Sequence, residues 1–173
     1  MKSARLTFRP IEYADAARIA HLAGDWDVAR MTARIPHPYS LTQAHEWIGT
    51  IGGDEFVRGV ALKGDLIGAV GFIGSEGPTA EIGYWIGKPW WGNGYATEAA
   101  EALVDYCFTD AGLAHLTCCH FTDNLASERI IKKLGFKLIG PCTAWCEARG
   151  SETPTLRYQR RRPIMMKFRR RAA

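Results

Sequence analysis

The chain has 173 residues, of which 47% are hydrophobic and 23% charged, so it is long enough for one globular domain and too apolar for a disordered chain. Its formal charge of +4 is uneven, because the segment 156–173 carries eight Lys and Arg residues and no acid, which leaves residues 1–155 at −4. A domain that is basic over its whole surface, as in general nucleic-acid-binding proteins, is therefore excluded, whereas a basic C-terminal arm over residues 163–173 is not.

The sequence also bears on the compartment and on metal binding. No run reaches the roughly 18 apolar residues that a membrane-spanning helix needs, and the N-terminal residues lack the apolar core of a signal peptide. The five cysteines are odd in number and irregularly spaced, which favours reduced thiols in the cytoplasm and offers no set of metal ligands at fixed spacing. We expect a single cytoplasmic domain over residues 1–173, without a metal and without membrane contact.

The first half of the chain predicts one strand, two helices and an antiparallel meander. A strand over residues 5–10 ends at a proline, and a helix follows over residues 14–25. The residues SLTQ form a capping box that begins a helix over 41–50. Three strands separated by short turns come next, over residues 55–62, 66–74 and 80–87. Gly83 inside the third strand indicates a bulge or the close approach of another group.

The second half alternates helices and strands and ends with two strands. The expected elements are a helix, a strand, a helix and two strands, over residues 97–112, 115–121, 125–135, 136–142 and 155–162. A meander followed by this alternation predicts an α/β fold (α+β in some schemes) with a mixed, mostly antiparallel sheet of about seven strands flanked by helices. We expect the final, arginine-rich strand at or next to the edge of the sheet, where its charges would hinder pairing with another chain.

The most informative segment is the turn WWGNGYATE, which begins at Trp90 and leads into the helix over 97–112. Small residues at Gly92, Gly94 and Ala96 let the backbone come close to a ligand. The free N–H groups and the positive dipole end of a helix N-terminus favour an anion, which suits a pyrophosphate. Taken alone, the same segment is also compatible with a glycine-rich turn that only reverses the chain.

Further motifs in a fixed order narrow the interpretation. They read RLTFRP, EIGYW, WGNGYATEA, NLAS and KLGF, at residues 5–10, 81–85, 91–99, 124–127 and 133–136. With these motifs the chain resembles the GNAT superfamily of acetyl-CoA-dependent N-acetyltransferases, and most closely its Rim-type branch, which acetylates the N-terminal amines of ribosomal proteins. The resemblance implies a single-domain GNAT fold whose sheet has a V-shaped split between the fourth and fifth strands, where acetyl-CoA is bound.

The same resemblance implies a set of cofactor-binding residues. Trp91 stands where the family pattern usually has Gln or Arg, so the backbone N–H groups that follow it are expected to hold the phosphates. Main-chain groups of the fourth strand would pair with the pantetheine amides, and Asn124 corresponds to an Asn that bonds this arm. The expected residues are Tyr84, Trp85, Ile86, Trp91, Gly92, Asn93, Gly94, Tyr95, Ala96, Thr97 and Asn124.

Acetyl transfer to an amine needs a neutral amine, a stabilised oxyanion and a departing thiolate that is protonated or tolerated. Glu81 is the candidate base, acting through water, although it also fits a solvated strand acid or a member of an ion pair. A main-chain N–H near Trp85 or Ile86, freed by the bulge, is expected to contact the oxyanion.

The candidate acid is Ser127, by resemblance to the Rim-type branch. The Tyr that many GNAT enzymes carry seven positions after the Asn is replaced here by Ile131. Ser127 also suits a helix cap, and His120 is a further candidate that also fits a structural hydrogen bond. The thiolate can also leave without help, because a thiol pKa near 8.5 makes it a tolerable leaving group.

These features predict an acetyl-CoA-dependent N-acetyltransferase whose acceptor is a protein N-terminal α-amine. Two alternatives stay open: a small-molecule amine such as an antibiotic or polyamine, and a catalytically silent GNAT-like module that contacts RNA or the ribosome through its basic tail. A homodimer, with the segment IMMKF packed on a neighbour, also stays open. By resemblance the acceptor side is framed by the helix over 41–50 and by Trp26, Met31, His37 and Tyr39.

Overall fold

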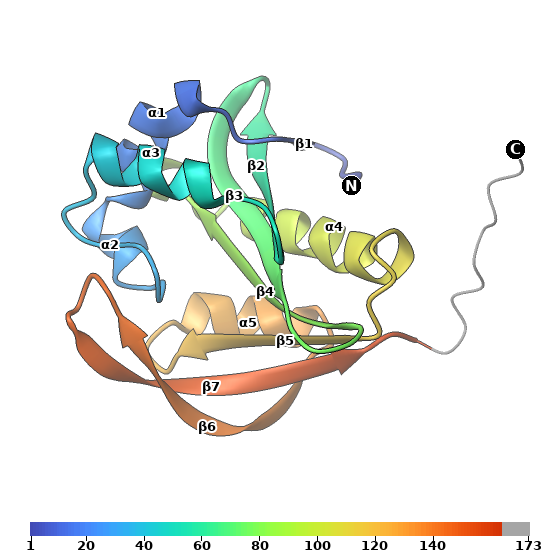
Figure 1. The fold of residues 1–173 in the computed structure, drawn as a ribbon. Helices are drawn as coiled ribbons and strands as arrows, with labels where there is room; N and C mark the ends of the chain where they lie inside the picture. The colour runs from blue at the N-terminus through green and yellow to red at the C-terminus, as the bar shows by residue number, and fades with distance from the viewer. Residues whose placement is uncertain (164–173) are drawn as a thin grey trace, which may run out of the picture.

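A seven-stranded mixed sheet is the framework of the protein, and its strands lie in the order β1-β2-β3-β4-β5-β7-β6 (Figure 1). The computed structural model describes residues 1–163, so the predicted basic arm and its IMMKF segment lie outside the described residues, apart from Pro163. Only β4 and β5 run parallel, which confirms the mixed, mostly antiparallel sheet. The strands are β1 (Thr7–Arg9), β2 (Glu55–Leu62), β3 (Asp65–Gly74), β4 (Thr79–Ile86), β5 (His115–Phe121), β6 (Lys137–Cys146) and β7 (Ser151–Arg161).

Helices cover both faces of this sheet. Helices α4 (Tyr95–Thr109) and α5 (Leu125–Lys133) contribute to the larger core cluster, while α1 (Ala16–Ala23) and α3 (Leu41–Thr50) form a second cluster with Leu66 on the other face. The predicted capping box begins α3, with reciprocal bonds between Ser40 and Gln43. Three short elements were not predicted: α2 (Trp26–Ala29) and the 3-10 turns η1 (Tyr13–Asp15) and η2 (Lys88–Trp90).

The predicted split lies between β4 and β5. These parallel strands pair only over Thr79–Glu81 and His115–Thr117. Beyond this point β5 continues along β7 for its whole length, and β4 continues along β3 (Figure 1). The two strands therefore separate into a wedge, and within residues 1–163 the edge of β4 that faces β5 carries main-chain groups without a strand partner from Tyr84 onward.

The bulge expected at Gly83 is not in the structure. The register between β3 and β4 is continuous through the pair Gly71–Gly83, and the irregularity of the meander lies instead between Val60 and Ala61 of β2. A Cβ on Gly83 would meet no heavy atom within 4 Å. The wedge opens because β5 departs, not because β4 is distorted.

The last two strands form a longer hairpin than predicted. Strands β6 and β7 continue to Cys146 and from Ser151, so that only four residues, 147–150, connect them. Strand β7 lies between β5 and β6, one position in from the edge. Its arginines therefore do not protect an edge; on the edge strand β6 a register shift and Pro141 hinder further pairing.

An ion pair fastens the N-terminal strand to the first helical segment. Arg9 donates to both carboxylate oxygens of Asp15, each at 2.7 Å, and the Glu12 amide donates to the same carboxylate at 2.9 Å. The hydrogen bonds from Arg9 are the main cause of a pKa of Asp15 below its usual 3.8.

We expect Asp15→Asn to lower the free energy of unfolding by about 2 kcal/mol at pH 7, because the paired charge and its hydrogen bonds are lost. Since the pKa of Asp15 is lowered in the folded state, its contribution is present above 3.8 and disappears as the pH falls through the folded-state pKa. Urea unfolding should thus show a difference from wild type that is constant between pH 5 and 8 and shrinks below pH 4. Asp65→Asn, at an exposed turn position, is the control; a pH-independent difference for Asp15→Asn would contradict the assignment.

Candidate active site

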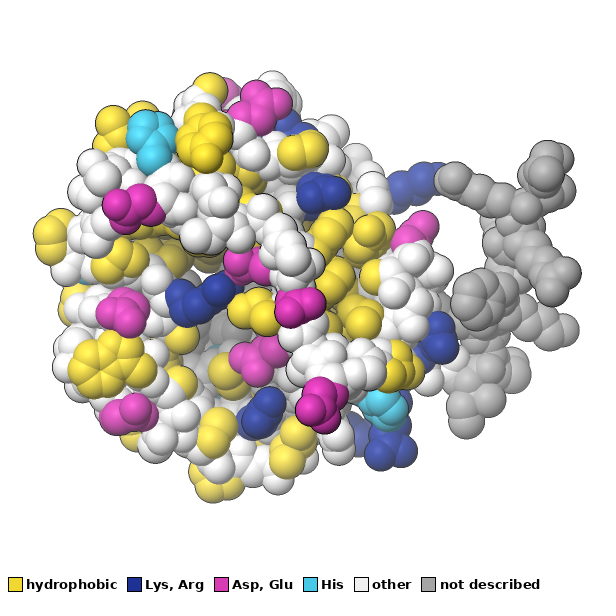
Figure 2. All heavy atoms as spheres, in the orientation of Figure 1, with side chains coloured by type: hydrophobic (Ala, Val, Ile, Leu, Met, Phe, Trp, Pro, Cys, Tyr) yellow, Lys and Arg dark blue, Asp and Glu magenta, His cyan; other side chains and the backbone are white. Residues whose placement is uncertain are grey.

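A single cavity of about 1080 Å³ occupies the wedge and extends toward α3 and the β6 hairpin. Figure 2 shows the hollow in this face of the molecule, with acidic and basic side chains around it. Of the catalytic and cofactor-binding residues expected from the sequence, those that line it are Glu81, Tyr84, Trp85, Ile86, Trp91, Gly92, Gly94, Tyr95, Ala96, Thr97, His120, Asn124 and Ser127.

The glycine-rich turn has the geometry of an anion site. Gly92 and Gly94 have φ angles of 77° and 79°, a region in which glycine is strongly preferred, and Gly94 is the N-cap residue of α4. Helix α4 begins at Tyr95, two residues earlier than predicted, so its first-turn N–H groups face the opening. The Asn93 side chain does not line the cavity; it donates to the carbonyls of Trp90 and Trp91 at 3.2 and 3.0 Å and thereby fixes the turn.

Trp91 has a structural role that its sequence position did not indicate. Its indole Nε1 donates to the main-chain carbonyl of Ile86 at 2.6 Å. The indole thereby caps the end of β4 and fixes the turn against the strand.

The alternation of hydrogen bonds along β4 determines which main-chain groups face the wedge. The amide of Gly87 donates to β3, at 2.8 Å from the carbonyl of Ile67. Since successive residues of a strand face opposite sides, the main-chain groups of Trp85 also face β3 and only its side chain lines the cavity. Beyond the paired positions, the N–H groups that face the wedge belong to Tyr84 and Ile86.

Tyr84 and Ser127 approach each other across the wedge. The Tyr84 hydroxyl on β4 lies 2.9 Å from the Ser127 hydroxyl on α5. Asn124 is the cap of α5, because its side-chain oxygen accepts the Ser127 amide at 3.0 Å. Burial raises the pKa of Tyr84 well above its usual 10, so this phenol stays protonated at neutral pH. The Ser127 hydroxyl is therefore not used as a cap and faces a neutral phenol.

Glu81 lies at the last paired position of β4 and β5, with its side chain on the opposite face of β4 from Tyr84. Its carboxylate accepts the Cys119 thiol at 3.4 Å and lies 3.6 Å from the guanidinium of Arg157. The ion pair considered from the sequence is therefore present, and its Glu81 lines the cavity. Burial, assisted by Glu81, raises the pKa of Cys119 to about 12, so its thiol stays protonated.

The structure gives His120 a structural role. Its ring is 5% exposed and is bonded on both sides, to the carbonyl of Phe121 at 2.8 Å and the hydroxyl of Tyr158 at 3.3 Å. Over residues 1–163, no three His, Cys, Asp or Glu side chains are grouped as metal ligands would be. Within the same range, no helix combines the length and apolarity needed to span a bilayer.

The β6–β7 hairpin forms one rim of the cavity. Its tip residue Arg149 donates to the carbonyl of Arg30, at 2.7 Å, and to the carboxylate of Asp123, at 2.9 Å. The Glu147 amide donates to the carbonyl of Ala33 at 2.9 Å. The hairpin is thus joined to the segment after α2 and to the end of β5, which encloses this half of the cavity.

The residues expected to frame the acceptor side fall into two groups. Met31 and Tyr39 line the cavity, together with Gln43 and Trp47 of α3. Trp26 and His37 are not part of the lining and contact each other, with ring centroids 5.1 Å apart.

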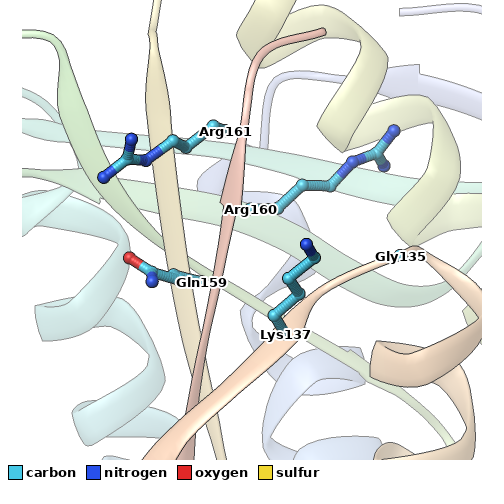
Figure 3. Close-up of a pocket in the computed structure, with 5 residues that line it drawn as sticks. All are labelled: Gly135, Lys137, Gln159, Arg160 and Arg161. Carbon is cyan, nitrogen blue, oxygen red and sulfur yellow. The ribbon is translucent and has the colours of Figure 1, made fainter.

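A second recess, of about 450 Å³, lies near the turn after α5 and is lined by Gly135, Lys137, Gln159, Arg160 and Arg161. In Figure 3, Gln159 and Arg161 project from one side of β7 and Arg160 from the other. Its cationic groups therefore do not converge on one point as a built anion site would require.

Comparisons with known proteins agree with this geometry. A family model described as an acetyltransferase (GNAT) domain matches residues 5–137. The uncharacterized N-acetyltransferase p20 of Bacillus licheniformis is 31% identical over 156 residues, which are 84% of this chain and 86% of that protein.

Solved structures share the fold. RimJ of Mycobacterium smegmatis, in complex with CoA-disulfide, matches with a TM-score of 0.82 at 19% identity, over 94% of this chain and 85% of that chain. The ribosomal-protein-S5-alanine acetyltransferase of Vibrio fischeri matches with a TM-score of 0.81 at 16% identity, over 96% and 98% of the two chains.

We expect Cys119 to react slowly with iodoacetamide at pH 8, since the thiolate is the reactive form and its pKa is raised to about 12. Glu81→Gln removes a negative charge beside the thiol and should speed its alkylation a few-fold. Mass spectrometry of the peptides over time gives the rates, with the exposed Cys142 as internal control. Equal Cys119 rates in wild type and Glu81→Gln would exclude the contact in solution.

Proposed function

The chain belongs to the acetyltransferase (GNAT) family, whose members use acetyl-CoA, and from this premise we propose that it acetylates the N-terminal α-amine of a protein. In this proposal the amine nitrogen attacks the thioester carbonyl directly and coenzyme A leaves as the thiol. Solved structures named as ribosomal-protein acetyltransferases share the fold and support this choice of acceptor.

The observation that carries the proposal is the continuity of the cavity. One space of about 1080 Å³ reaches from the N-termini of α4 and α5 through the wedge to Gln43 and Trp47 of α3. This is at the upper end of the roughly 300–1,000 Å³ of a small-molecule site. It suits the pantetheine arm of acetyl-CoA together with several residues of an extended chain end. Glu46 in the lining favours a positively charged terminus, whereas Glu55 is paired with Arg34 at 2.7 Å.

The proposed position of acetyl-CoA follows from three features of the wedge. Its pyrophosphate would lie on the first turn of α4, where Gly92 and Gly94 leave space and N–H groups are free. Its pantetheine amides would pair with the wedge-facing main chain of Tyr84 and neighbouring residues, as an added strand. The carbonyl of Ile86 already accepts the Trp91 indole, so this residue would contribute through its N–H.

In the proposed chemistry the base and the acid come from opposite faces of β4. Glu81, on the acceptor face, removes the amine proton through water. The Tyr84 N–H faces the wedge and stabilises the oxyanion that forms when the nitrogen attacks, because the Ile86 N–H lies five residues, about 16 Å, from Glu81 along the strand. As the C–S bond breaks, Ser127 gives its proton to the sulfur, and the protonated Tyr84 hydroxyl donates to the Ser127 oxygen and directs that proton into the wedge.

Thiol release from acetyl-CoA tests the acceptor. Peptides with a free N-terminus should support release, whereas the same peptides with a blocked N-terminus and an internal lysine should not. Spermidine and an aminoglycoside complete the panel. Turnover only with these small amines would replace the proposal by a small-molecule acetyltransferase. No turnover together with salt-sensitive RNA binding would indicate a silent binding module.

Ser127→Ala should lower kcat by roughly 100-fold, the lower end for general acid catalysis, while the KM for acetyl-CoA changes little. Tyr84→Phe should lower kcat less, and the double variant should equal Ser127→Ala, because Tyr84 acts through the serine. Tyr106→Phe, on α4 and stacked on Phe56, is the matched control. If Ser127→Ala keeps the wild-type kcat, the serine is not the acid. If the effects of the two substitutions on kcat add in the double variant, Tyr84 does not act through the serine.

A further inference from the structure

Arg5, which precedes β1, lies at the N-terminus of α4, although 93 residues separate it from its partner there. Its Nε and its main-chain N–H both donate to the carboxylate of Glu98, each at 2.7 Å. Its guanidinium carbon lies 4.6 Å from the ring centroid of Tyr95, in a cation–π contact. The hydroxyl of Ser3 bonds the same carboxylate. Arg5 is therefore held at the first turn of the helix by its contacts with Tyr95 and Glu98.

The orientation of Arg5 leaves its terminal nitrogens beside the glycine-rich turn. Its Nη2 lies 3.6 Å from the position that a Cβ would occupy on Gly94, the N-cap residue. Within residues 1–163, Nη1 and Nη2 make no hydrogen bond, since Glu98 binds only Nε and the main-chain amide. The side chain is 49% exposed, so a ligand at the turn can reach these two groups.

The charges around the turn require a cation at this place. Residues 90–97 contain no Lys or Arg, and the nearby Lys88 is paired with Asp27 at 2.7 Å. Glu98 places a carboxylate in the same helical turn, which would repel a bound phosphate if it were not neutralised. Trp91 supplies no polar group to the turn, because its indole is bonded to Ile86. Arg5 neutralises the charge of Glu98, and its Nη1 and Nη2 groups can still donate hydrogen bonds to a ligand.

We propose that Arg5 is a cofactor-binding residue whose terminal guanidinium nitrogens bond a phosphate of acetyl-CoA at the N-terminus of α4. Glu98 and Tyr95 are its positioning residues: they hold the planar guanidinium with its free edge toward Gly94. This inference rests on the acetyl-CoA position given under the proposed function. A planar fork with two free donors suits a phosphate oxygen pair, which a lysine ammonium would match less well.

Isothermal titration with acetyl-CoA, in the absence of any acceptor, tests the proposal. Arg5→Gln should weaken binding at least about tenfold at 50 mM NaCl, the loss expected for a charge-assisted hydrogen bond. The difference from wild type should shrink at 300 mM NaCl, because salt screens the interaction with phosphate. The affinity of Arg5→Lys for acetyl-CoA should lie between those of wild type and Arg5→Gln, since lysine keeps the positive charge but lacks the forked guanidinium. Lys63→Gln, at the exposed β2–β3 turn, should bind as wild type at both salt concentrations.

Two results would overturn the role of Arg5: affinities of Arg5→Gln and wild type within twofold at 50 mM NaCl, or a difference that is the same at both salt concentrations. The second result would mean that Arg5 only ties the N-terminal segment to Glu98. Gly94→Glu separates this failure from that of the cofactor position, because its carboxylate blocks the turn itself. If Gly94→Glu leaves the affinity unchanged, acetyl-CoA is bound elsewhere and both proposals are wrong. If Gly94→Glu abolishes binding and Arg5→Gln does not weaken it, only the role of Arg5 is wrong.

Discussion

The early separation of β4 and β5 is the constraint on which the rest of the structure depends. Parallel strands in the middle of a sheet normally pair along their length, but here the pairing covers three residues on each strand. Strand β5 then follows β7, and the edge of β4 is left with main-chain donors and acceptors that face a cavity. Such groups need a hydrogen-bond partner, so this edge of β4 can pair with the amides of a ligand. The elements that border the opening, namely β4, the turn into α4 and the start of α5, hold the candidate site residues.

The sheet also separates the two halves of the proposed reaction. Successive side chains of β4 face opposite sides, so Glu81 belongs to the face covered by α1 and α3, and Tyr84 to the face covered by α4 and α5. Under the proposed function, the acceptor approaches from the first face and coenzyme A from the second. Only the thioester and the attacking nitrogen then meet in the plane of the sheet. This arrangement keeps the base away from the leaving thiol without any additional barrier.

Local sequence predicted the parts of the protein that depend on local geometry. Gly92 and Gly94 predicted a turn before a helix, and the SLTQ pattern predicted a helix start; both are present, and the two glycines have positive φ. Other features depend on residues that meet only in the folded chain. Asn124 and Ser127 are both good caps, so the sequence did not decide between them, and the wedge leaves the serine facing Tyr84. Residues 143–154 resemble a polar loop, with Pro154 and Gly150, yet pairing between β6 and β7 makes all of them strand except the connection 147–150. The hydrogen bond from the Trp91 indole to the Ile86 carbonyl likewise could not be predicted, because no sequence pattern indicates it.

Under the proposed function, the hairpin encloses the acceptor half of the cavity, and this has a consequence for how substrate preference can change. The match to the family description ends at residue 137, where β6 begins, so the hairpin lies almost wholly beyond it. Its tip is held by carbonyls of the segment 30–33, which is distant from the turn at the start of α4. Substitutions at these two places would reshape the acceptor entrance while the acetyl-CoA turn stays the same. Under the proposed function, the donor and acceptor preferences of such a protein can therefore change independently, one at the turn into α4 and the other at the hairpin.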